Sequence, residues 1–370
     1  MHFLLIPYTL LCVFFVTNFA SRKHAHARGA LLLMGGLTLA LLFVTMWLRP
    51  ATGDSWRYME HFRNMRALSL SNALAYKDTD PLFVLLNWFA GLLGNSSLVL
   101  FGATLLVYFG VFIAATRKLL SPVSALVVIM AYTAFPFFVA YAASGLRQGL
   151  AMMFLFMGYV CLARGQKQAW VWLLLAPLWH SGAWLAVMVT AAHQLMCLVV
   201  KAPKLRWALV LLVLLGAIGL SATGLNQSLM SLLPEAIELR DTQEIYFEDP
   251  DLYGYRAGFR PDFLIFSLFP LLTAFALRKR GDTFNYNGPG WWLSLYLGLN
   301  VIYHLFSFAP FSDRFAGFSW FLMPLVIFLQ VQRTRSHNLQ TIFVAAICLV
   351  NVAMMQLYTG NFIRFPEDWL

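Results

Sequence analysis

Charge is scarce in this chain. Only 11% of its 370 residues are charged, whereas 60% are hydrophobic and 16% are aromatic. So little charge excludes an ordinary soluble domain, in which about 25% of the residues are Asp, Glu, Lys or Arg. The apolar residues form continuous runs of about 20 residues and do not alternate with polar ones, which excludes a membrane β-barrel. The composition therefore predicts an all-α, polytopic integral membrane protein.

Sequence motifs for cofactors are also missing. The four cysteines lie singly in apolar runs without a CxxC spacing, so we expect neither a disulfide framework nor a cysteine metal site. The chain has no HExxH motif and no glycine-rich phosphate loop. We therefore expect no metal, no cofactor and no nucleotide-binding fold. The net charge of +10 does not indicate nucleic-acid binding, because a charge asymmetry between the two sides of a membrane explains it.

Acidic residues are almost absent from one set of breaks between the apolar runs. These six short breaks hold 15 of the 26 Lys and Arg residues but only one of the 16 acids, Asp282. Short basic loops stay on the cytoplasmic side during insertion, so both termini and the acidic loops are expected on the outer side. The basic residues of the six breaks lie at Arg22–Arg28, Arg117–Lys118, Arg164–Lys167, Lys201–Arg206, Arg278–Arg280 and Arg333–Arg335, and Asp282 follows the fifth of these clusters.

The apolar runs predict about 12 transmembrane helices in a single membrane domain, residues 1–370. Two long outer loops interrupt them, 49–97 and 223–261. In the first loop, the apolar segment 81–94 would be only about 21 Å long as a helix, which is too short to cross a membrane comfortably. We therefore expect a re-entrant or interfacial helix there. The predicted spans are 1–20, 29–48, 98–116, 120–143, 146–163, 168–179, 181–200, 206–222, 262–277, 289–308, 315–332 and 338–358.

Arg147 is the first candidate functional residue, and it lies at the outer start of a predicted span. An arginine in a membrane helix is costly unless it faces a cavity or a partner. Glycines at 145 and 149 allow another group to approach closely. A planar guanidinium at a helix N-terminus favours a phosphate as its ligand. The alternative is an interfacial arginine whose side chain extends to the lipid headgroups.

His180 is the second candidate, and it follows the short apolar segment 168–179, which contains Pro177. A helix that is broken at membrane depth is tolerated where its backbone lines a polar cavity. The histidine can serve as a base there, or it can be a buried structural group. The remaining outer candidates are Asp54 with Tyr58 one turn later, Arg260 before a helix start at Pro261 and Asp262, and Asp313 with Arg314, which can simply pair with each other.

These stretches, in this order, resemble the EpsG-like and Wzy-type polysaccharide polymerases. The similarity covers residues 45–185 well and 295–330 faintly. One element departs from the usual form, because Ser55-Trp56 stands where such proteins tend to have Asp-Tyr. The matching elements are G-D-S-W-R-Y from Gly53, D-P-L-F-V-L-L-N-W from Asp80, S-G-L-R-Q-G-L-A from Ser144, W-H-S-G-A from Trp179 and a weaker D-R-F from Asp313.

The resemblance implies a GT-C-like membrane glycosyltransferase that acts at the periplasmic face of a bacterial inner membrane. Its donor and acceptor would be oligosaccharide repeat units on undecaprenyl diphosphate. A Wzz-type chain-length regulator and a Wzx-type flippase would be its partners. His180 is the first choice for the catalytic base and Asp54 the second. The substrate-binding residues would be Tyr58, Arg147, Gln148, Arg260, Asp313 and Arg314.

Two other functions stay open on the sequence. An O-antigen ligase would use similar outer arginine and histidine residues but would move a finished chain onto lipid A. A flippase or other transporter of lipid-linked sugars would need charged residues within its spans. The predicted spans are nearly free of charge, which favours an enzyme over a transporter.

Overall fold

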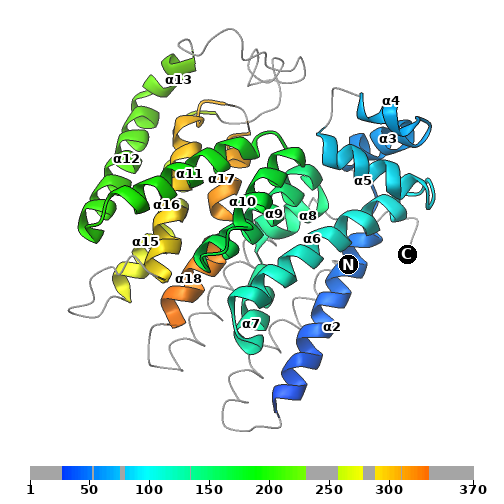
Figure 1. Cartoon of the computed structure of the whole chain (residues 1–370), viewed down its shortest axis with the longest axis horizontal. Helices are drawn as coiled ribbons and strands as arrows, with labels where there is room; N and C mark the ends of the chain where they lie inside the picture. Colours follow the sequence, from blue (N-terminus) through cyan, green and yellow to red (C-terminus); the bar gives the residue numbers. More distant parts are fainter. Residues whose placement is uncertain are drawn as a thin grey trace. The chain divides into compact units, whose positions relative to one another are not determined.

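A computed structural model describes residues 27–51, 54–75, 80–133, 135–230, 257–277, 288–309 and 311–332. Throughout these residues the regular elements are helices, without any strand, so the all-α prediction is confirmed (Figure 1). The chain divides into two compact units, Met1–Ser181 with Val331–Leu370, and Gly182–Gln330. Each unit is described by itself.

The first unit contains the helices that follow the predicted spans 29–48 to 168–179. A 3₁₀ turn, η1, closes the last of them. The elements are α2 (Ala27–Trp47), α3 (Asp54–Arg66), α4 (Leu70–Leu74), α5 (Pro81–Gly91), α6 (Ser97–Leu119), α7 (Pro122–Thr133), α8 (Pro136–Ala143), α9 (Leu146–Ala163), α10 (Ala169–Leu175) and η1 (Ala176–Leu178).

The second unit is built around α16, which packs against α11, α12 and α17. Buried polar bonds fix this core: Tyr296 donates to the Ser267 carbonyl at 2.8 Å, and Trp320 donates to the Ser267 hydroxyl at 2.7 Å. The elements are α11 (Ala183–Val199), α12 (Pro203–Thr223), α13 (Leu225–Met230), α15 (Pro261–Ala276), α16 (Pro289–Leu305), α17 (Asp313–Trp320) and α18 (Met323–Gln332).

Among the described residues, four segments are long and apolar enough to cross a membrane, which makes the chain an integral membrane protein. They are Ser97–Leu119, Leu146–Ala163, Pro203–Thr223 and Asp313–Gln332. The predicted count of about 12 spans stays a prediction, and the predicted spans 1–20 and 338–358 lie outside the described residues.

The predicted span 120–143 is not one straight helix. It consists of α7 and α8, which meet at an angle of 72°. Pro136 begins α8, and the residue before a proline is disfavoured in helical conformation, so the chain breaks there. The pair can be counted as a fifth, bent span.

The loop 49–97 returns to the side of the first unit from which it leaves. Trp47, the last residue of α2, donates its ring N–H to the carbonyl of Leu98 at the start of α6, at 2.7 Å. The short apolar helix α5 lies between Trp47 and Leu98 in the sequence. Its 11 residues would extend about 16 Å, so the expected short helix is present, and its position relative to the membrane stays a prediction.

Helices α3, α4 and α5 pack on one another around a small apolar core of Met65, Ala73 and Val84 (Figure 1). Trp88 donates to the Leu68 carbonyl at 3.2 Å, which ties the outer side of α5 to the end of α3. This small helical group carries two of the polar segments that the sequence singled out, 54–58 and 80–88.

Gly149 lets α9 pack tightly against α6 and the end of α8. A Cβ at this position would lie 2.6 Å from the Tyr141 carbonyl oxygen and 3.0 Å from the ring of Tyr108. The expected role of this glycine in close approach is therefore confirmed. The corner between α8 and α9 is therefore closely packed at this point.

Candidate functional site

The corner between α8 and α9 places Arg147. The hydroxyl of Ser144 donates back to the Ala140 carbonyl at 3.1 Å, which ends α8. Gly145 lies against the ring of Tyr141, where a Cβ would come within 2.6 Å. Helix α9 then begins at Leu146, so Arg147 stands in its first turn with 27% of its side chain exposed.

A break in the helical path places His180. Helix α10 ends at Leu175 and η1 continues as a tight turn that includes Pro177. The sequence predicted this interruption, and the structure confirms it. Beyond the break the amide of Ser181 points at a side chain from another segment, and His180 keeps 28% of its side chain exposed.

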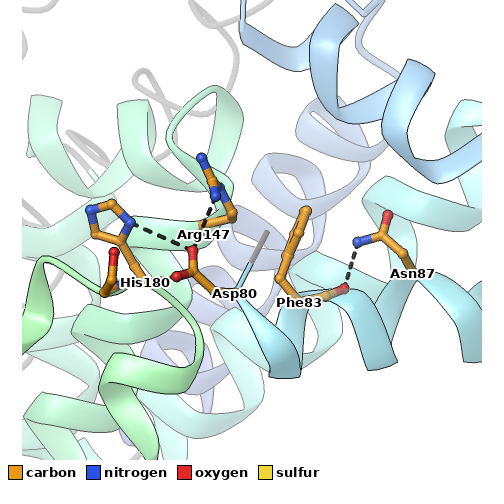
Figure 2. Close-up of polar contacts among 6 residues, drawn as sticks. Asp80, Phe83, Asn87, Arg147 and His180 are labelled. Atoms are coloured by element: carbon orange, nitrogen blue, oxygen red, sulfur yellow. Dashed lines mark hydrogen bonds and ion pairs between the residues drawn. The ribbon is translucent and has the colours of Figure 1, made fainter. Parts of the chain in front are cut away.

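Asp80 brings the two segments together. It stands immediately before α5 but does not cap that helix with its side chain. One carboxylate oxygen accepts a hydrogen bond from Arg147 Nη1 at 3.0 Å and lies 3.9 Å from His180 Nδ1. The other oxygen accepts a hydrogen bond from the Ser181 amide at 3.0 Å. Figure 2 shows Arg147 and His180 converging on Asp80.

Burial differs sharply within this cluster, which we call the Asp80 cluster: Asp80, Arg147, His180 and the amide of Ser181. The carboxylate is only 3% exposed, whereas the guanidinium and the imidazole each keep more than a quarter of their surface. A buried carboxylate is stable only when it is paired and hydrogen-bonded. The buried carboxylate therefore positions the guanidinium and the imidazole. Within this cluster, these two more exposed groups are the ones that a ligand can reach.

Helix α3 closes one side of the Asp80 cluster. The hydroxyl of Ser55 donates to the Ala143 carbonyl at 2.9 Å, which anchors α3 to the end of α8. One turn later, the ring of Tyr58 lies 5.9 Å from the Arg147 guanidinium carbon and packs edge-on against Phe83. Of the sequence candidates, Tyr58 thus joins Arg147 and His180.

Two other candidates, Asp54 and Gln148, stand close in sequence to members of this group. Asp54 is the first residue of α3, which confirms that it stands one helical turn before Tyr58, but its side chain lies outside the described residues. Gln148 follows Arg147 in α9 and is 5% exposed, so it belongs to the interior of the first unit.

Arg260, Asp313 and Arg314 belong to the second unit. Arg260 forms an ion pair with Asp262 at 2.5 Å and lies over the ring of Phe263 at 3.6 Å. The predicted helix start at Pro261 and Asp262 is confirmed. Arg314 stands in the first turn of α17, with its guanidinium carbon 5.0 Å from the centre of the Phe311 ring.

Asp80 is the residue that sequence reasoning did not select. In the sequence it stands out only as the first letter of a family-like element. A usable signal was present: an aspartate directly before Pro81, at the start of an apolar helix too short to span. In the described residues no group of three His, Cys, Asp or Glu side chains could hold a metal ion; Asp78 lies outside them.

A comparison with known protein families identifies one match. The model of a family described as EpsG family matches residues 30–364, nearly the whole chain, and this range includes every member of the Asp80 cluster. No curated protein and no solved structure matches the chain.

Proposed function

The chain belongs to the EpsG family of polysaccharide-polymerase-type membrane proteins, and on this basis we propose a specific activity for it. It is a membrane glycosyltransferase that joins oligosaccharide repeat units carried on undecaprenyl diphosphate, at the periplasmic face of a bacterial inner membrane. The observation that carries the proposal is the buried Asp80 carboxylate, which holds a reachable guanidinium and a reachable imidazole side by side.

The reaction requires one bond to form and one to break. The acceptor hydroxyl oxygen attacks the anomeric carbon of the donor sugar, and the bond from that carbon to the diphosphate oxygen breaks. The acceptor's proton passes to Nε2 of His180, and undecaprenyl diphosphate leaves with its developing negative charge. A positioned base of this kind commonly contributes a factor of about 10²–10⁴ in rate.

The members of the Asp80 cluster divide this work. Asp80 faces Nδ1 of His180, which favours the tautomer that leaves Nε2 free to accept the proton and stabilises the imidazolium that forms. Arg147 offers a planar fork that suits a phosphate oxygen pair and can stabilise the leaving group without a metal ion. Tyr58 provides an aromatic face next to the guanidinium, suited to a sugar ring.

Incubation of the purified protein with a lipid-linked repeat unit tests the activity. We expect a ladder of products that differ by one repeat unit, and we expect EDTA to leave the ladder unchanged. A single shift in the presence of lipid A would instead indicate a ligase. Unchanged substrate, in conditions where the protein moves it across a vesicle membrane, would indicate a transporter and contradict the proposal.

Packing supports the two-sided arrangement of the loops. Arg164 donates to the Lys118 carbonyl at 2.6 Å, and Gln332 donates to the Ser124 hydroxyl at 2.9 Å. Helix ends next to three of the basic breaks therefore lie close together.

We predict from this arrangement that single cysteines at Ser71, Gln243 and Thr359, in a cysteine-free background, react with a membrane-impermeant reagent in intact spheroplasts. A cysteine at Ser336 should react only after the membrane is opened, and the reverse pattern would overturn the orientation.

A further inference from the structure

Arg49 is a buried arginine outside the Asp80 cluster. It stands two residues beyond the end of α2 and is only 5% exposed. Burial lowers the pKa of its guanidinium to about 9, so the group is still protonated at neutral pH. A buried charge of this kind is costly and is retained in membrane proteins chiefly where it has a function.

The contacts of Arg49 use only part of its guanidinium. Nη1 donates to the Met46 carbonyl at 2.5 Å, and the guanidinium carbon lies 3.9 Å from the centre of the Phe101 ring. Nε and Nη2 are buried without a hydrogen-bond partner, and no acidic side chain among the described residues forms an ion pair with this arginine. Among the described residues its charge is therefore not balanced by an acidic side chain, in contrast to that of Arg147.

The two atoms without partners form one edge of the guanidinium. The N–H bonds of Nε and Nη2 are parallel, and this edge matches two oxygens of a phosphate or a carboxylate. In Arg206 the same edge of the guanidinium has a structural role, because it binds backbone carbonyls. Its Nε donates to the Val200 carbonyl at 2.5 Å and its Nη2 to the Cys197 carbonyl at 2.9 Å. In Arg49 neither nitrogen of this edge has a hydrogen-bond partner in the described part of the chain.

Arg49 lies on the same side of the first unit as Arg147. Phe101, over which its guanidinium lies, stands at the start of α6, about two turns before Tyr108. Tyr108 packs against Gly149, two residues after Arg147. Arg49 also lies six residues before Ser55, which limits its distance from the α8–α9 corner to about 20 Å of extended chain. Pro50 and Ala51 are only partly buried, so the surface is close.

We propose that the Nε–Nη2 edge of Arg49 binds a phosphate or diphosphate group of a membrane lipid, as an anion site separate from Arg147. In one respect this rests on the proposed function: a polymerase must hold two lipid diphosphates at once, one on the donor and one on the acceptor. Asp80 already balances the charge of Arg147, whereas Arg49 carries an unbalanced charge on the same side. Arg49 would then hold the diphosphate of the second lipid-linked substrate.

Lipid binding by the full-length protein in detergent micelles tests this site. Calorimetric titrations would use undecaprenyl diphosphate, phosphatidylglycerol and inorganic diphosphate as separate probes. We expect Arg49→Lys to weaken undecaprenyl diphosphate binding about tenfold or more, because lysine keeps the charge but loses the bidentate edge. Arg206→Lys is the matched control, since its edge is occupied by backbone carbonyls, and it should leave the affinity unchanged.

The other outcomes each decide a point. Equal weakening for phosphatidylglycerol would make Arg49 a general headgroup site and overturn its assignment to a substrate. Unchanged affinity for all probes would make Arg49 only a cap for the carbonyl end of α2, and the proposal would be wrong. Arg49→Met removes a charge that no acidic side chain among the described residues balances, so its melting temperature without ligand should equal or exceed that of the wild-type protein. If Arg49→Met does not fold, the lipid affinity of Arg49→Lys decides whether the anion site exists.

The site and the proposed function can fail independently. If the wild-type protein binds undecaprenyl diphosphate through Arg49 but makes no ladder from repeat units, the polymerase assignment fails and the anion site stands. If ladders form and Arg49→Lys changes neither the ladder nor the lipid affinity, the anion site fails and the polymerase assignment stands.

Discussion

Asp80→Asn is expected to slow polymerisation about 10³- to 10⁴-fold, the size of effect seen when an aspartate that orients a catalytic histidine loses its charge. Asparagine keeps the shape of the side chain and an oxygen that can accept from the Ser181 amide. It removes the charge that pairs with Arg147 and faces His180. Ladder formation, measured as initial rate, reports the loss, and the melting temperature shows whether the variant is folded.

Glu60→Gln is the matched control for this variant. Glu60 is an exposed carboxylate on α3, and the same change of charge there should leave the rate close to that of the wild-type protein. A folded Asp80→Asn protein that forms ladders at the wild-type rate would show that the carboxylate takes no part in the reaction. The Asp80 cluster would then be a structural ion pair.

His180→Gln is the second decisive variant. Glutamine keeps a hydrogen-bonding group of similar reach but cannot take up the acceptor's proton, so we expect it to be as slow as His180→Ala. Both should lose a factor of about 10²–10⁴ in rate. Binding of the lipid-linked donor and the melting temperature should stay close to those of the wild-type protein, because the diphosphate contacts lie elsewhere.

A structural histidine predicts the opposite pattern. Glutamine would be tolerated, and alanine would destabilise the fold by about 1–3 kcal/mol through an unpaired buried partner. The double variant with Asp80→Asn adds a further check. If the two residues act as one unit, the double variant is no slower than the slower single variant. An active His180→Gln protein would move the role of the base to Asp54.

The sequence was sufficient to predict the class of protein and half of the Asp80 cluster. Scarce charge and long apolar runs predict membrane helices whatever their packing. Arg147 and His180 were visible because each is a polar residue at the outer end of an apolar run, where the environment makes it costly. The family resemblance was confirmed over nearly the whole chain.

Asp80 could not be selected in the same way, because its importance comes from packing. Its partners lie 67 and 101 residues further along the chain, and no spacing rule joins such distant positions. The bend between α7 and α8 has a local origin instead. Hydropathy alone reads 120–143 as one run, and only the backbone restriction imposed by Pro136 divides it. Arg49 likewise has no distinguishing pattern in the sequence, because only the packing around it leaves Nε and Nη2 buried without hydrogen-bond partners among the described residues.

The distance in sequence between Asp80 and its partners has a consequence for synthesis. Ser181 leaves the ribosome 101 residues after Asp80, which at about 5–20 residues per second is a delay of roughly 5–20 s. Arg147 follows Asp80 by 67 residues and Ser181 by 101, so the carboxylate first lacks both partners and then still lacks the Ser181 amide. A carboxylate without its full set of partners is not stable in hydrocarbon. We therefore expect the segment around α5 to stay in contact with water while α6 to α10 are inserted. It can take up its final position only after Ser181, the last of these partners of Asp80, has been synthesised.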